Sequence, residues 1–119
     1  MTEERLYLDY LRDIRENAEI ALELVKGMTY EQFANDVRTK YAVVRALEII
    51  GEAAKHVSAE VRKRYPGVPW SDMAGMRDRL IHQYAGILYD VVWHTATARV
   101  RDILPRIESA IREEEAKRR

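Results

Sequence analysis

The chain has 119 residues, of which 47% are hydrophobic, with 20 acidic side chains balancing 20 basic ones and no cysteine. This length and apolar content suit one domain with one core and exclude intrinsic disorder. The lack of thiols excludes disulfides, zinc ribbons and thiol catalysis, and the charges scattered through residues 1–30 exclude a signal peptide or a membrane span. We therefore expect a soluble, cytoplasmic protein with no membrane partner. A net charge of zero leaves nucleic acid open as a ligand, because a basic footprint can be local.

Helical periodicity dominates the first half of the chain. Thr2 is a plausible N-cap of the first helix, which ends at Gly27. Thr29 caps a short helix over residues 30–35, and Asp36 begins a long third helix. The first and third helices each carry one apolar stripe with steps of three and four, formed by Tyr7, Leu11, Ile14, Ala18, Ala21 and Val25 in the first and by Val43, Leu47, Ile50, Ala54 and Val57 in the third.

The second half continues the helical pattern. Ser58 caps a short helix that ends at Tyr65, and the proline- and glycine-containing stretch 66–70 is the clearest loop. Ser71 caps the next helix, and Asp90 begins the last long one. Pro105 lies within that run and should kink the helix or start a new one. Its apolar stripe is formed by Trp93, Thr97, Val100, Leu104, Ile107 and Ile111.

These elements predict an all-α fold, an antiparallel helical bundle of three long and two to three short helices. A single domain covers residues 1–111, and residues 112–119 form a charged C-terminal tail that should fray. Apolar residues beyond one stripe suggest a second buried surface and hence a homodimer. The alternative is that a central helix in a monomer has a wide apolar face. These additional apolar residues are Tyr10, Leu22, Leu24, Val91 and Val92.

The stretch "GMRDRLIHQY", residues 75–84, combines Arg77, Asp78, His82 and Tyr84 on a predicted helix. Histidine can act as base or acid near neutral pH, and arginine carries a permanent charge that matches phosphate oxygens. Together they suit metal-free cleavage of RNA by its own 2′-hydroxyl. Arg77 and His82 point about 140° apart on an ideal helix, which favours a site shared across a two-fold axis, whereas Asp78 shares a face with His82. The alternative is an ordinary helix surface, because such a pair often arises by chance.

Two further stretches strengthen the functional interpretation. "MAGMRDRLIHQY" resembles the signature of the HEPN superfamily, and its Arg-x4-His-x-Tyr form resembles the HepT-like toxins. "RALEIIGEAAKHVS", residues 45–58, is similar to the Ile-Gly-Glu-Ala segment on the long central helix of those proteins, and the "PGVPW" loop followed by "SDMAGMRD" is similar too. The resemblance runs from about residue 5 to residue 111. One departure is "HQYAG", where many relatives have "HGYFG".

This resemblance implies a homodimeric endoribonuclease toxin of a type VII-like toxin–antitoxin system, which needs no metal or other cofactor. Arg77 and His82 would be the catalytic pair, with Asp78 as their polar companion. The implied partner is an MntA-like minimal nucleotidyltransferase antitoxin, which would neutralise the toxin by AMPylation of Tyr84. An alternative for the same family is a non-catalytic, substrate-binding partner subunit of that nucleotidyltransferase.

Other polar residues have candidate supporting roles. Arg45, Glu48, Glu52 and Lys55 form a charged stripe on the long helix, which is either a solvated face or a polar line that supports Arg77; Arg45 and Glu52 are the candidates for support. Gly75 could let another helix approach. His56 is interpreted as surface and His94 as structural, and the three histidines lack metal-ligand spacing. Possible RNA contacts are Arg79, Arg62, Lys63 and Arg64.

Overall fold

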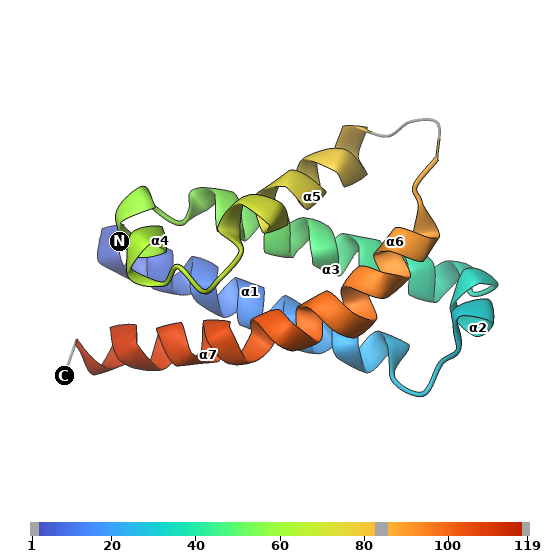
Figure 1. Ribbon diagram of the computed structural model, residues 1–119, viewed down its shortest axis with the longest axis horizontal. Helices are drawn as coiled ribbons and strands as arrows, with labels where there is room; N and C mark the ends of the chain where they lie inside the picture. The colour runs from blue at the N-terminus through green and yellow to red at the C-terminus, as the bar shows by residue number, and fades with distance from the viewer. Residues whose placement is uncertain (1–2, 83–85, 118–119) are drawn as a thin grey trace.

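The computed structural model describes residues 3–82 and 86–117, with side chains at 7–80 and 86–117, and every regular element in these ranges is a helix (Figure 1). This confirms the predicted all-α class. None of the described helices combines the length and apolar character needed to cross a lipid bilayer. The elements are α1 (Glu3–Val25), α2 (Tyr30–Ala34), α3 (Val37–His56), α4 (Ala59–Arg64), α5 (Trp70–His82), α6 (Tyr89–His94), the π-helical turn η1 (Thr95–Arg99) and α7 (Val100–Ala116).

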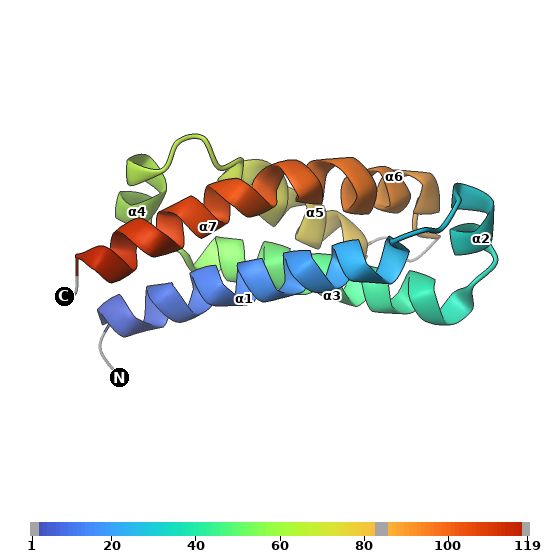
Figure 2. The same ribbon diagram turned by 90° about the horizontal axis from the view of Figure 1, so that it is seen from below.

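The long helix α1 lies in the middle of the molecule. It packs against α3 on one side and against α7 on the other, and α5 packs chiefly on the outer side of α3 (Figures 1 and 2). Tyr10, Leu22 and Leu24, which fall outside the main stripe of α1, are partly buried against the core. The central position of α1 therefore accounts for its wide apolar face without a dimer. Val92 is buried in the core as well, whereas Val91 is 48% exposed.

The predicted helix boundaries are mostly confirmed, because they depend on local chemistry. Gly27 follows α1 with a φ of +77°, and Thr29 and Gln32 form a reciprocal capping box at α2. Asp36 accepts a hydrogen bond from the backbone N–H of Thr39, and Ser58 caps α4 in the same way. The predicted stripe of α3 is buried throughout.

The predicted cap at Ser71 is wrong. Trp70 is already the first residue of α5, and the backbone N–H of Met73 donates to the carbonyl of Pro69 at 3.0 Å. The helix begins early because Trp70 is buried and its indole Nε1 donates to the carbonyl of Tyr65 at 3.0 Å, which fixes the loop against the start of α5. Ser71 therefore lies inside the first turn.

The last long helix contains a π-helical turn, η1. Thr95 and Thr97 donate their hydroxyl protons to the carbonyls of Val91 and Trp93, at 2.8 Å and 2.7 Å, and such back-bonding competes with the regular helical pattern. Pro105 lies inside α7 on the exposed side, where water can solvate the carbonyl that loses its partner. Because α7 continues through Pro105, no new helix starts there, and the predicted kink stays a prediction. The elements α6, η1 and α7 follow one another without a break and form one rod.

The prediction that residues 112–119 fray is wrong for the described part of that segment, because α7 continues to residue 116. Glu114 is 1% exposed and accepts hydrogen bonds from the Tyr7 hydroxyl at 2.6 Å, from Arg64 and Lys117 at 3.0 Å each, and from the Tyr65 hydroxyl. Burial alone would raise the pKa of Glu114, but the donated hydrogen bonds outweigh it and lower the pKa to about 2. This carboxylate fastens the end of α7 to α1 and to the segment after α3.

Candidate functional site

The motif helix α5 touches α3 most closely at Gly51. A Cβ atom on Gly51 would lie 2.1 Å from the Cβ of Arg77 and 2.7 Å from the carbonyl oxygen of Met73. No other residue fits there without moving α5, so a glycine at this point of α3 sets the position of Arg77. Gly75, the glycine expected to admit another helix, meets only the Arg79 side chain of its own helix within 4 Å.

Arg77 is held by two carboxylates. Its Nε lies 2.8 Å from Oε2 of Glu52 on α3, and its Nη1 donates to Oδ1 of Asp78 at 3.1 Å. The Arg77–Glu52 contact is an ion pair without directed hydrogen-bond geometry, and Oε2 is shielded from solvent. The Arg77 side chain is 24% exposed, and its Nη2 has no partner within the described residues. The guanidinium is therefore oriented by the protein and keeps donors for an incoming anion.

Asp78 is fixed from the other side by Lys55, whose Nζ donates to Oδ1 of Asp78 at 3.0 Å. The hydrogen bond from Lys55 and then that from Arg77 lower the pKa of Asp78 below its usual value. Asp78 is consequently anionic at neutral pH and positions Arg77, and it is a poor candidate for a general base.

Glu52 also contacts a histidine that sequence reasoning missed. Nε2 of His56 lies 3.1 Å from Oε1 of Glu52, and the His56 ring stacks on Tyr10 of α1 with centroids 5.0 Å apart. His56 was interpreted as surface, and it is exposed; it also belongs to a chain of polar contacts that runs through Glu52 and Arg77 to Asp78. Its spacing of four residues from Glu52 on one helix was the available signal.

Arg45 lies beside this chain without joining it. It lines a shallow hollow of about 210 Å³ together with Tyr10, Glu52 and His56. No ion pair of Arg45 occurs among the described residues. The structure thus brings Glu52 to Arg77, as the candidate supporting role requires, and does not bring Arg45 there.

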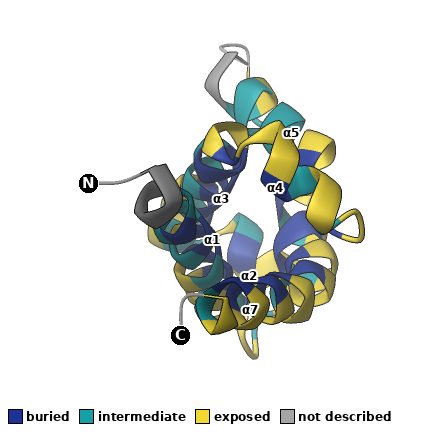
Figure 3. Cartoon of the chain, turned by 90° about the vertical axis from the view of Figure 1, so that its left-hand side faces the viewer, coloured by how far each residue is buried: buried dark blue, intermediate teal, exposed yellow. Residues whose placement is uncertain are grey.

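His82 is the last residue of α5, and its side chain lies outside the described part of the molecule, as does all of Tyr84. Arg77 faces α3. The prediction that His82 points about 140° away from Arg77 on an ideal helix stays a prediction. Most described positions of α5 from residue 73 on are only partly buried, in contrast to the buried inner faces of α1 and α3 (Figure 3).

The basic cluster on α4 is largely engaged within the fold. Arg62 donates to the carbonyls of Ala54 and Val57 at 2.6 Å and 3.0 Å, which closes the C-terminal end of α3. Arg64 binds Glu114, and Lys63 is exposed. Figure 1 shows α4 at the end of the molecule where both termini lie, away from the C-terminal end of α5. The structure does not bring these three residues to Arg77.

Arg79 faces a different part of the surface. It lines a cleft of about 680 Å³ between α5 and the rod formed by α6, η1 and α7, together with His94. His94 is exposed at this cleft, and its interpretation as a structural residue stays a prediction. Among the described side chains no group of three or more acidic or histidine residues could hold a metal ion.

Comparison with known proteins identifies the family. The model of the family described as "Ribonuclease HepT-like" matches residues 14–110. "Putative RNase MJ1216" of Methanocaldococcus jannaschii is 44% identical over 108 residues, which cover 91% of this chain and 89% of that protein. "Probable ribonuclease HepT" of Thermococcus cleftensis is 45% identical over 91 residues, which cover 76% and 83%.

A third relative, "Putative RNase TTE0752" of Caldanaerobacter subterraneus, is 39% identical over 88% of this chain and 94% of its own length. No solved structure matches the chain. The family model thus covers most of the chain. The chain belongs to the HepT-like ribonuclease family.

Proposed function

We propose that the chain is a metal-independent endoribonuclease. Family membership and the names of its relatives support this activity. The structural observation that carries the proposal is the orientation of Arg77: two carboxylates hold the guanidinium, and Nη2 has no partner within the described residues. A preorganised charge of this kind stabilises a phosphate that gains negative charge in the transition state.

The proposed reaction is transfer of the phosphate within the RNA. The 2′-hydroxyl loses its proton to a base and attacks the adjacent phosphorus, the bond to the 5′-oxygen breaks, and an acid protonates that oxygen. The products are a 2′,3′-cyclic phosphate and a 5′-hydroxyl. His82 acts as base or acid, and Arg77 stabilises the phosphorane.

One histidine serves one of the two proton transfers at a time. A two-fold dimer would bring two copies of His82 and Arg77 to one cleft, so that one histidine accepts the proton and the other donates. The offset of about 140° that an ideal helix gives residues five positions apart supports this arrangement, because Arg77 and His82 of one motif would then face in different directions. The homodimer is part of the proposal.

The proposed biological role is that of a toxin in a type VII-like toxin–antitoxin system. The partner is an MntA-like nucleotidyltransferase that transfers AMP onto Tyr84, two residues after His82. Each adenylate adds a bulky anion beside the site, which repels the RNA backbone and blocks access.

A second candidate function is a non-catalytic partner subunit of that nucleotidyltransferase. It is favoured by the fact that Glu52 and Asp78 already neutralise Arg77, as in a purely structural ion-pair network. This candidate predicts tight binding to the nucleotidyltransferase and no cleavage of RNA by the isolated chain.

The deciding experiment is cleavage of an end-labelled single-stranded RNA in EDTA by the purified chain, with product ends identified by mass. We expect 2′,3′-cyclic phosphate ends, and a loss of roughly a hundredfold or more in rate for His82→Ala and for Arg77→Ala. Arg112→Ala is the matched control, because Arg112 is exposed on α7 and has no partner among the described residues. Equal cleavage by wild type and His82→Ala, or no cleavage by wild type, refutes the proposal.

A further inference from the structure

The cleft beside Arg79 is separate from the contacts that hold Arg77. Arg79 follows Arg77 by two residues and therefore points about 200° away from it round α5. The cleft of about 680 Å³ lies between α5 and the rod of α6, η1 and α7. Its volume is that of a small-molecule site, large enough for one nucleotide.

The floor of the cleft is apolar. Met73 and Ile103 are 2% and 8% exposed, and Met76 and Val91 complete the apolar lining from the two walls. Thioether and branched aliphatic side chains offer a surface for the flat face of an aromatic ring. The floor alone would suit any planar apolar group, so the rim decides which ligand fits.

The rim carries unpaired charges of both signs. Arg79 comes from α5 and Arg99 from η1, and both guanidinium groups are exposed and have no ion pair among the described residues. Asp72 on α5 and Asp90 on α6 are exposed carboxylates that also have no salt-bridge partner in the described part of the chain. Opposite charges in one cleft without mutual pairing leave both available to a ligand.

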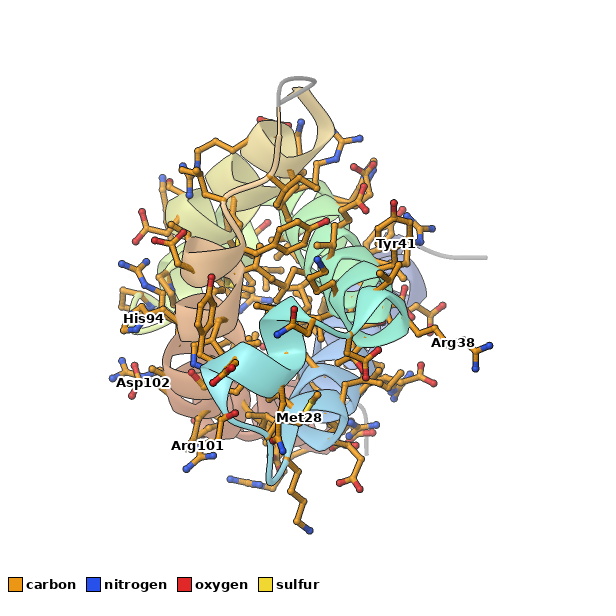
Figure 4. All side chains as sticks on the ribbon, turned by 90° about the vertical axis from the view of Figure 1, so that its right-hand side faces the viewer. Met28, Arg38, Tyr41, His94, Arg101 and Asp102 are labelled. Atoms are coloured by element: carbon orange, nitrogen blue, oxygen red, sulfur yellow. The ribbon has the colours of Figure 1, made fainter. Side chains whose placement is uncertain are left out.

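The π-helical turn forms much of one wall. It places Thr95 and Arg99 on the cleft, directly after His94. Figure 4 shows His94 and Asp102 projecting from the same side of this rod. Asp102 lies 3.7 Å from Arg106 and is thus already paired. π-helical turns are frequent at functional sites, because they displace side chains from the positions of a regular helix.

This pattern selects among ligands. A surface that only follows the phosphate backbone is uniformly basic, whereas Asp72 and Asp90 would repel a bare phosphate. A ligand that fits must present an anion to the arginines, a planar ring to the floor and hydrogen-bond donors to the carboxylates. An unpaired nucleotide with an amino group on its base meets all three requirements. Guanine fits best, because its N1–H and its amino group can both donate to one carboxylate.

We propose that this cleft binds one unpaired guanine nucleotide of the RNA and thereby selects where the RNA is cut. This proposal rests on the proposed ribonuclease function for its biological meaning, but binding of the nucleotide itself needs no cleavage. The cleft reads the base through Asp72 and Asp90, while Arg79 and Arg99 bind the flanking phosphates.

The binding test is a titration of the whole chain with GMP and, in parallel, with UMP, followed by NMR shifts of the backbone amides of Thr95 and Ile103. We expect GMP to shift both amides and to bind about tenfold more tightly than UMP, which has no amino group on its base. The Asp72→Asn and Asp90→Asn changes combined should remove this preference. Arg101→Ala should leave binding unchanged, because Arg101 lines a different groove beside Lys26.

Equal binding of GMP and UMP overturns the base preference, and the absence of shifts at both amides overturns the site. Shifts of these amides that depend on protein concentration without nucleotide show that a second copy covers the cleft, which also overturns it. Arg99→Ala should raise KM about tenfold for an RNA with a single guanosine and leave kcat unchanged. His82→Ala should bind GMP like wild type. Guanine-selective binding by a chain that cleaves no RNA would refute the proposed function and leave this inference standing.

Discussion

Replacement of Gly51 by alanine tests whether the close crossing of α3 and α5 positions Arg77. The new Cβ would lie 2.1 Å from the Cβ of Arg77, and ordinary contact begins at 3.4 Å, so α5 must retreat by about 1.3 Å. The second obstacle is the carbonyl of Met73, so the backbone of α5 has to move and a rotamer change is not enough. Overpacking of this kind costs about 1–3 kcal/mol of folding free energy.

The same retreat would lengthen the 2.8 Å contact between Arg77 and Glu52. A misplacement of about 1 Å in a catalytic group can reduce the rate roughly a hundredfold. We therefore expect Gly51→Ala to unfold at lower urea concentration and, under conditions where it is fully folded, to cleave RNA far more slowly than wild type.

Gly75→Ala is the matched control for this experiment. The new Cβ would lie 3.5 Å from the end of the flexible Arg79 side chain, which is ordinary contact, and alanine favours the helix by about 1 kcal/mol. Urea denaturation and RNA cleavage are measured on both variants. An unchanged unfolding midpoint and an unchanged cleavage rate in Gly51→Ala would refute the assignment of the crossing as the feature that sets Arg77.

Three further predictions concern charged groups. Glu52→Gln should lower kcat about tenfold, because it removes the ion pair with Arg77. Thermal stability should change little, because the pair is partly exposed. An unchanged pH–rate profile and an unchanged kcat would contradict this role of Glu52. Glu114→Gln should cost about 3 kcal/mol in urea denaturation, because Arg64 and its other donors lose a buried anion; a cost below about 1 kcal/mol would show that the network is dispensable. The pKa of Glu114 is lowered from 4.5 to about 2 in the folded protein. Its contribution to stability is therefore complete above pH 4.5 and is lost as the pH falls through about 2. Wild type should lose more stability than Glu114→Gln between these two pH values.

Much of the fold could be predicted from the sequence because its determinants are local. Thr29, Asp36 and Ser58 each cap a helix by accepting from a backbone N–H three residues on, and the stripe of α3 is visible in the sequence as a helical period. Glu114 could not be predicted in the same way. It stands in a run of three glutamates, and only the packing of α7 against α1 decides which one faces Tyr7 and Tyr65.

The same difference between local and long-range determinants applies to the candidate site. The link from Glu52 to Arg77 was expected as a supporting contact, since the charged stripe and the motif each stood out in the sequence, and the structure contains it. The cleft between Arg79 and Arg99 had no sequence signal, because its walls come from α5 and η1, which are separated along the chain, and a π-helical turn has no clear sequence signature. Only the fold brings such distant segments together, so this cleft could not be predicted from the sequence.

The position of α5 at the edge of the molecule has an evolutionary consequence. The core lies between α1, α3 and α7, whereas α5 is attached chiefly to α3. Substitutions on the outward positions of α5 therefore require few compensating changes in the core. Under the proposed function, a substitution at an outward position of α5 would change the contacts with RNA while Gly51 keeps Arg77 in place. The helix that would select the substrate is thus distinct from the helices that form most of the core.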